Sequence, residues 1–365
     1  MNIVIFGLTI SSSWGNGHAT LWRGLCKALA GDRHRVVFFE RDVPYYAGAR
    51  DMHELAGGKL VLYSDWADIR AQARREVQAA DVAIVTSYCP DALDAAELIG
   101  TEAAGLSVFY DLDTPVTLAR LSIGSQVPYI GPRGLADFDL VLSYTGGAAL
   151  NELCSRLGAR NVAPLYGHVD PEVHQPVSPQ MHYRSDLSYL GTYSADRQSG
   201  LEAFLIRPAE QRPERRFLIG GAQYPQEFPW SSNIYFVRHL PPSEHAAFFS
   251  SSRLTLNVTR EPMARMGWCP SGRLFEAAAC GTPVLTDYWD GLDDFFTPGA
   301  DILVARDASG ALDALDLSDA ELARIGRAAR ERTLDEHTSE RRARDLVGIL
   351  ETARHDVRRP VPAEA

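Results

Sequence analysis

Short apolar segments alternate with amphipathic helical segments along this chain, and the alternation stops once before it starts again. In the first half, strands are expected at residues 2–6, 35–40, 82–86 and 106–112, with helices between them. Strands separated by helices favour a parallel sheet that is covered on both faces. A chain of 365 residues is long enough for two such domains, each with its own core.

The interruption lies at residues 166–179, which contain three prolines and show no helical period. Such a segment is typical of a linker between domains. The alternation then restarts with a strand expected at residues 187–190. We therefore predict an α/β chain of two domains, 1–168 and 169–337, followed by a charged helical tail. The last residues, 358–365, are expected to fray.

Composition excludes several classes of protein. The net charge is −11 and no Lys/Arg cluster carries interleaved aromatic residues, so a nucleic-acid partner is not expected. The five cysteines are scattered without a Cys-x-x-Cys pair, which indicates reduced thiols and a cytoplasmic protein rather than a zinc site or a disulfide framework. Residues 1–6 lack a basic flank and are predicted as a strand rather than a signal peptide. No apolar run is long enough for a membrane span.

Lysine is almost absent, with Lys27 and Lys59 as the only two. Neither is followed by Ser or Thr, so a Walker phosphate loop is absent. Any clamp for a phosphate group should therefore be built from arginine, which offers bidentate donors and keeps its charge.

Residues 269–287 are the most informative segment, because they are expected to form a loop, a helix and a strand. Ser271 and Gly272 open the helix, where free N–H groups and the helix dipole can hold a phosphate. Arg273 and Glu276 lie three residues apart and share one helical face. Such a site could hold a nucleotide whose ribose hydroxyls need an acceptor. An ordinary β–α–β crossover is the alternative.

The loop after the first strand, residues 7–17, is rich in glycine and serine. Gly15 and Gly17, with Glu40 at the end of the second strand, imitate a dinucleotide-binding fingerprint, although Thr20 replaces the third glycine. An NAD(P)-dependent oxidoreductase is therefore one alternative. His18 opens the next helix and could exchange a proton or donate to a phosphate; a histidine bonded only to backbone is the other interpretation.

Asp111 and Asp113 end a strand whose C-terminal edge should face a ligand crevice. At period two their side chains would point the same way. An Asp-x-Asp pair could suggest a metal, but two carboxylates without a third ligand make a weak site, so no metal is predicted. We favour Asp113 as a substrate contact or base and Asp111 as structural. A helix cap formed by Asp113 is the alternative.

Taken in order, these segments resemble GT-B glycosyltransferases of the family-4-like kind, and most closely the branch related to the spore-maturation glycosyltransferase CgeB. The Val-Asp-Pro-Glu run at 169–172 resembles the hinge of these enzymes. The resemblance implies two Rossmann-like domains with parallel sheets facing across a cleft, and a C-terminal helix, 338–356, that packs back onto the first domain. One departure is clear: the family's usual first glutamate falls on Trp268.

The resemblance also implies roles for individual residues. The donor would be bound by these residues: Gly17, Gly191, Thr192, Arg197, His239, Ser271, Gly272, Arg273 and Glu276. Glu276 would hold the nucleotide ribose, and Arg197 and Arg273 the diphosphate. His18, Asp113 and Arg197 would be catalytic, with His18 and Asp113 orienting the acceptor.

The function implied is transfer of a hexose from a nucleotide diphosphate sugar, most simply a UDP-sugar, to an acceptor that is a saccharide, a protein or a natural product. The reaction would be retaining and independent of metal, with the nucleotide sugar as co-substrate and no other cofactor. Two alternatives share the fold: a nucleotide-sugar 2-epimerase, and a non-catalytic protein that binds a nucleotide sugar.

Overall fold

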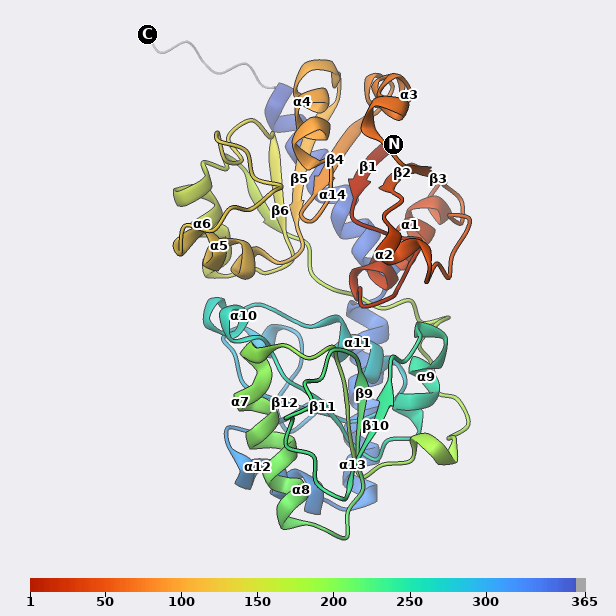
Figure 1. The fold of residues 1–365 in the computed structure, drawn as a ribbon, viewed down its shortest axis with the longest axis vertical. Helices are drawn as coiled ribbons and strands as arrows, with labels where there is room; N and C mark the ends of the chain where they lie inside the picture. The colour runs from red at the N-terminus through yellow and green to blue at the C-terminus, as the bar shows by residue number, and fades with distance from the viewer. Residues whose placement is uncertain (359–365) are drawn as a thin grey trace. The chain divides into compact units, whose positions relative to one another are not determined.

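The computed structural model describes residues 1–358 and divides the chain into two compact units (Figure 1). The first unit comprises residues 1–166 and the C-terminal segment that begins at Glu340; the second is Gly167–Ser339. The frayed end predicted for residues 358–365 lies, beyond Arg358, outside the described residues.

The first unit is built on seven parallel strands in the order β3-β2-β1-β4-β5-β6-β7. The strands are β1 (Asn2–Gly7), β2 (Arg35–Arg41), β3 (Lys59–Tyr63), β4 (Val82–Thr86), β5 (Leu106–Asp111), β6 (Leu140–Ser143) and β7 (Val162–Pro164). The strand order reverses between β1 and β4. In an open parallel sheet, ligands bind outside the carboxyl ends of the strands at such a reversal.

Helices cover both faces of this sheet, as expected for parallel strands. They are α1 (His18–Gly31), α2 (Pro44–Ala47), α3 (Trp66–Gln78), α4 (Ala92–Glu102), α5 (Thr114–Ser122), α6 (Ala148–Leu157) and α14 (Ser339–Arg358). The last of these, blue in Figure 1, lies along the sheet although it comes from the far end of the chain. Its buried side chains Ala343, Leu346 and Leu350 recur at helical spacing and join the core formed by β1, β4 and β5.

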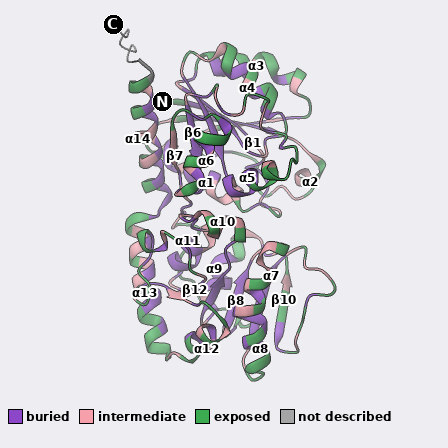
Figure 2. Ribbon diagram, turned by 90° about the vertical axis from the view of Figure 1, so that its left-hand side faces the viewer, coloured by how far each residue is buried: buried purple, intermediate pink, exposed green. Residues whose placement is uncertain are grey.

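The second unit has six parallel strands in the order β10-β9-β8-β11-β12-β13. They are β8 (Leu187–Leu190), β9 (Phe217–Gly221), β10 (Ile234–Arg238), β11 (Thr255–Asn257), β12 (Val284–Thr286) and β13 (Leu303–Val304). The order reverses between β8 and β11, so this unit has its own ligand edge. Figure 2 shows that buried residues concentrate on the strands of both sheets.

Helices and short turns connect the strands of the second unit. They are α7 (Gln198–Leu201), α8 (Arg207–Gln211), α9 (Pro242–Ser250), α10 (Glu261–Met266), α11 (Gly272–Ala279), α12 (Ala308–Asp316) and α13 (Asp319–Glu336), with short 3₁₀ turns η1 (Met181–Tyr183), η2 (Ala195–Arg197) and η4 (Leu292–Asp294). A π-helical turn, η3 (Glu202–Ile206), joins α7 to α8. Pro208 lacks the N–H that would continue the α-helical ladder there, which accounts for the wider turn. The charged tail is two helices, α13 and α14, that meet at the buried His337.

Candidate functional site

The segment 269–287 folds as the sequence predicts, with a loop, the helix α11 and the strand β12. Ser271 is the N-cap residue of α11, and its side chain accepts a hydrogen bond from the amide of Arg273. Arg273 and Glu276 share one face, and Nη1 of Arg273 donates to Oε2 of Glu276. The predicted anion-binding N-terminus, the cation Arg273 and the carboxylate Glu276 therefore all lie on one short helix.

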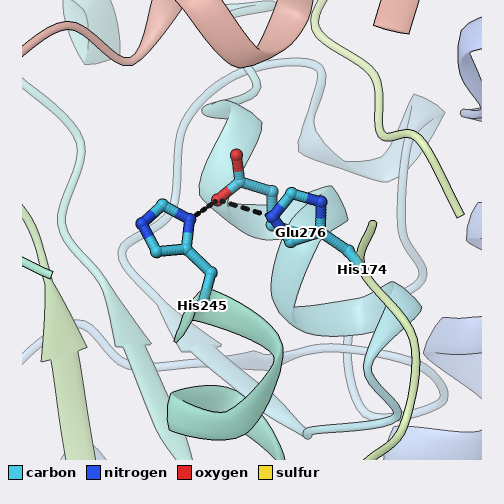
Figure 3. Close-up of side chains that lie close together, drawn as sticks. All are labelled: His174, His245 and Glu276. Carbon is cyan, nitrogen blue, oxygen red and sulfur yellow. Dashed lines mark ion pairs between the residues drawn. The ribbon is translucent and has the colours of Figure 1, made fainter. Parts of the chain in front are cut away.

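Glu276 is only 3 % exposed and lies between two histidines (Figure 3). Its Oε2 is 3.9 Å from Nε2 of His174 and 3.6 Å from Nδ1 of His245. Burial by itself raises the pKa of the Glu276 carboxyl, but the adjacent Arg273 guanidinium outweighs it and holds that pKa well below its usual range. The carboxylate is therefore ionised and ready to accept hydrogen bonds.

Both histidines are buried and neutral. Burial lowers the pKa of His174, and burial together with the Arg273 charge lowers the pKa of His245 to about 4. Nδ1 of His245 lies 3.2 Å from Nη1 of Arg273, and its Nε2 lies 3.3 Å from the Leu240 carbonyl. Because a guanidinium only donates, His245 carries its proton on Nε2.

Neither His174 nor His245 was identified from the sequence. His174 lies just after the hinge run 169–172, and His245 lies in α9. A single histidine in a loop or helix carries no local signal that separates a ligand-binding side chain from a core one. Only the packing of the His174 segment and α9 against α11 brings the two histidines to Glu276.

The loop after β8 carries three more of the predicted donor-binding residues. A Cβ on Gly191 would lie 2.7 Å from the Tyr189 hydroxyl, so this position requires glycine for space. Arg197 follows in the turn η2, where its Nη1 donates to the Thr192 carbonyl at 3.4 Å and its Nε has no partner among the described residues. The neighbouring Asp196 pairs with Arg260 at 2.8 Å. Arg197 thus keeps most of its donors for another acceptor.

Arg197 and Arg273 lie at the same edge of the second sheet. Burial raises the pKa of the Tyr189 phenol, and the positive charges of Arg197 and Arg273 both oppose that rise. That the two arginines bind a diphosphate stays a prediction. His239 lies close to the same edge, after β10, with φ +50° and its amide bonded to the Gly221 carbonyl at 2.7 Å.

The first unit places the other predicted residues at the carboxyl ends of its strands. Gly17 is the N-cap residue of α1, and His18 begins that helix with its ring stacked 6.4 Å from the ring of Tyr88. The hydroxyl of Tyr88 donates to Oδ2 of Asp113 at 2.8 Å. His18 and Asp113 therefore gather around Tyr88, a residue that was not identified from the sequence.

Asp111 is buried, whereas Asp113 is half-buried. The strand β5 ends at Asp111, so the alternation no longer applies to Asp113. Asp111 is fully buried and its Oδ1 accepts from the Asp113 amide at 3.0 Å, which is a structural role. Asp113 is the N-cap residue of α5, but its side chain makes no cap hydrogen bond. Its carboxylate therefore points to Tyr88 instead of capping the helix.

The hydrogen bonds of Glu40 bear on whether the loop after β1 is a dinucleotide-binding fingerprint. Its buried carboxylate accepts from the Thr9 and Ser11 hydroxyls, at 2.7 and 2.5 Å, and from the amides of Ile10 and Ser11, at 2.8 and 2.9 Å. These four bonds order the loop after β1. The acidic group that would bind the ribose in a dinucleotide site is occupied, which removes the main support for an NAD(P) enzyme.

Two further observations concern membrane spans and metal-binding side chains. Within residues 1–358, no helix combines the length and apolar character needed to cross a membrane. In the same part of the chain, one group of side chains has ligand atoms close enough to hold a metal ion, namely His174, His245 and Glu276. The Asp111–Asp113 pair does not form such a group.

Comparison with known proteins supports the fold and places the sequence similarity in the second half of the chain. Residues 197–348 match a family model described as glycosyl transferase-like. No curated protein matches the sequence. The fold is that of GT-B glycosyltransferases, with two Rossmann-like parallel-sheet domains, as predicted.

Among solved structures, the chain is similar to Anabaena HepE in complex with UDP-glucose, with 14 % identity and a TM-score of 0.68 over 96 % of this chain and 100 % of that one. An alpha-glucosyltransferase in complex with UDP has 12 % identity and a TM-score of 0.69 over 96 % and 100 %. Sucrose-phosphate synthase from Thermosynechococcus elongatus has 15 % identity and a TM-score of 0.66 over 96 % and 98 %. At these identities the likeness concerns the fold.

Proposed function

We propose that the protein is a glycosyltransferase that moves a hexose from a nucleotide diphosphate sugar to an acceptor hydroxyl, in the manner of the CgeB-related branch. The observation that carries the proposal is that the charges of Arg197 and Arg273 both act on the buried Tyr189, while Arg273 and the ionised Glu276 lie on α11 next to its N-terminus. Two of the similar solved structures hold UDP-glucose or UDP, which favours a UDP-sugar as the donor.

The chemistry follows from charge. Breaking the bond between the anomeric carbon and the phosphate leaves new negative charge on the nucleotide diphosphate. Guanidinium groups and the free amides at the start of α11 stabilise that charge, which a metal does in other enzymes, so the reaction needs no metal. Arg273 uses one of its five N–H donors on Glu276 and keeps others for a phosphate. Glu276 accepts from the ribose hydroxyls.

The acceptor side of the proposal uses the first unit. The carboxylate of Asp113, held by Tyr88, and the nearby His18 orient an acceptor hydroxyl. The product retains its anomeric configuration, with attack on the face that the diphosphate leaves and transfer of the acceptor proton to the departing phosphate. On this mechanism no covalent intermediate with the protein forms.

The first experiment is a thermal-shift panel of UDP-, GDP-, ADP- and TDP-sugars, because a ligand that binds the folded state raises its melting temperature by mass action. We expect a UDP-sugar to give the largest shift. Arg197→Ala should lower turnover about 100-fold, as expected when a group that stabilises transition-state charge is removed. Arg197→Lys should retain part of the activity. Arg207→Ala, at an exposed position on α8, is the matched control and should leave turnover unchanged.

Several outcomes would overturn the proposal. Near-normal turnover of Arg197→Ala removes that residue from the mechanism. A protein that inverts a centre of the donor sugar without any acceptor, seen by NMR of the products, is an epimerase. A protein that binds a nucleotide sugar and leaves it intact over hours is a binding protein. Loss of activity in EDTA contradicts the metal-independent mechanism.

A further inference from the structure

The buried group of His174, His245 and Glu276 is not fully explained by donor binding. The three side chains come from the segment after the hinge, from α9 and from α11, and their ligand atoms lie within 4.8 Å of one another. In Figure 3 ring nitrogens of both histidines face the same carboxylate oxygen. All three residues are at most 3 % exposed.

His174 is the unusual member of this group. Both of its ring nitrogens are buried and neither has a hydrogen-bond partner among the described residues. An unpaired buried polar group costs about 1–3 kcal/mol, so such groups in folded proteins normally contact a water molecule or an ion. The unpartnered nitrogen that faces Glu276 therefore indicates that this site can bind a water molecule or an ion.

Arg273 occupies the position of a cation in the group. Its Nη1 donates to Oε2 of Glu276 and to Nδ1 of His245. The Arg273 side chain is 27 % exposed, whereas Glu276 is 4 % exposed by side chain, so Arg273 is the partner of Glu276 that reaches solvent. A small cation at the position of the guanidinium would contact Glu276 and both histidines. It would then provide a partner for His174, which Arg273 does not.

The donor set selects the kind of cation. Two imidazole nitrogens and one carboxylate oxygen suit Zn²⁺ and its neighbours among the transition metals, whereas Mg²⁺ and Ca²⁺ prefer oxygen ligands throughout. A histidine binds a metal through a ring nitrogen that carries no proton. Zinc bonds of about 2.0–2.2 Å place tetrahedral ligand atoms about 3.4 Å apart. The three ligand atoms, now 3.6 to 4.8 Å apart, must therefore approach one another by at most about 1.4 Å.

We propose that His174, His245 and Glu276 form a binding site for one Zn²⁺-type ion, which displaces Arg273 and fills the fourth ligand position with water. A bound ion withdraws Glu276 from the ribose and moves Arg273 away, so it inhibits donor binding. This second consequence rests on the proposed glycosyltransferase function, whereas metal binding itself does not.

The test is titration of the full-length, chelator-treated protein with Zn²⁺, and with Co²⁺ as a spectroscopic probe whose visible absorption reports tetrahedral nitrogen and oxygen ligands. We expect one ion per chain. His174→Ala and His245→Ala should each weaken binding at least 10-fold, because each removes a ligand. His182→Ala, at an exposed histidine of the same unit, is the control and should bind as the parent does.

Arg273→Ala gives the sharpest result, because it removes the competing cation and leaves all three ligands in place. We expect it to bind Zn²⁺ at least 10-fold more tightly than the parent, and it remains informative if a histidine variant fails to fold. Absence of saturable binding in both the parent and Arg273→Ala would overturn the proposal. So would unchanged affinity in a folded His174→Ala variant.

The two proposals fail separately. Zn²⁺ that binds at this site should raise the apparent Kd of the UDP-sugar, and the effect should disappear in His174→Ala. If the protein binds Zn²⁺ but no nucleotide sugar, the proposed function is contradicted and the metal site is not. Unchanged UDP-sugar affinity in the presence of saturating Zn²⁺ would overturn the inhibitory part of the inference.

Discussion

The hydroxyl of Tyr88 donates a 2.8 Å hydrogen bond to the carboxylate of Asp113, although the two residues follow different strands, β4 and β5. Tyr88 has φ +65°, a conformation that costs energy for a residue with a side chain. Strain of this kind persists where the surrounding structure fixes it, and it is concentrated at functional sites. The strained backbone aims the phenol at Asp113.

The first prediction concerns this bond. In a double-mutant cycle with Tyr88→Phe and Asp113→Ala, followed by urea unfolding, we expect a coupling energy of about 1.5–3 kcal/mol, the usual net value of a hydrogen bond to a charged group. Tyr88→Phe should also lower kcat/KM for the acceptor about tenfold. Tyr129→Phe is the control, since the Tyr129 hydroxyl bonds to Thr117 rather than to Asp113. A coupling energy near zero would show that the bond does not form in solution.

Asp111 gives a prediction about pH. Burial raises the pKa of its carboxyl to about 6, from an ordinary value of 3.8. Between about pH 4 and pH 6 the folded protein therefore holds a proton that the unfolded chain has lost, so this group makes stability fall as pH rises through that window. The raised pKa corresponds to a loss of about 3 kcal/mol in the free energy of unfolding, and this loss is complete above pH 6.

Asp111→Asn should remove that dependence. The amide oxygen can still accept from the Asp113 amide, as Oδ1 of Asp111 does at 3.0 Å. We expect the variant to lose less stability than the parent between pH 4 and pH 6, as measured by urea unfolding at several pH values. Identical pH profiles for the two proteins would contradict a raised pKa at Asp111.

Glu40 supplies the third prediction. Glu40→Ala leaves two hydroxyls and two amides of the loop after β1 without their acceptor. We expect the free energy of unfolding to fall by about 2–4 kcal/mol, since each unsatisfied buried group carries a cost. Glu40→Gln should be milder, because its amide oxygen can serve both N–H groups and the hydroxyls can turn to accept. NAD⁺ and NADP⁺ should not change the melting temperature of the parent protein; a shift would revive the oxidoreductase interpretation.

Local patterns were sufficient to predict much of the fold. The strands β4 and β8 have the bounds that their apolar runs indicate, and α11 begins at the Ser271 cap. The strand β3, Lys59–Tyr63, was missed because its segment is only five residues long and too short to show a clear period. An error of this kind affects one element and not its neighbours, because the period of a strand or a helix is set by residues that are close in sequence.

The candidate sites were predictable only where one short segment holds them. Arg273 and Glu276 are three residues apart, so their contact follows from helix geometry. His174, His245 and Glu276 are separated by long stretches of chain, and no local pattern records that their segments pack together. The occupied carboxylate of Glu40 was likewise hidden, because burial and hydrogen bonding depend on the tertiary structure.

Trp268 shows how one departure from the family pattern is accommodated. It stands where related enzymes have a glutamate, and its indole nitrogen donates to Asp294 at 2.6 Å. The ring lies against Gly291, where a Cβ atom would be only 2.4 Å from ring carbons. The tryptophan at 268 therefore requires glycine at 291, which also has φ +86°.

The last prediction follows from this contact. Gly291→Ala should lower the free energy of unfolding by more than about 2 kcal/mol, because it adds a steric clash to the cost of a left-handed conformation. Gly299→Ala is the matched control: Gly299 has φ +79° but no atom within 4 Å of the added Cβ, so only the conformational cost of about 1–2 kcal/mol should appear. Trp268→Ala should relieve the clash, making the double variant with Gly291→Ala more stable than the sum of the single effects predicts. Additive effects in urea unfolding, or equal losses for the two glycine variants, would show that the indole does not pack on Gly291.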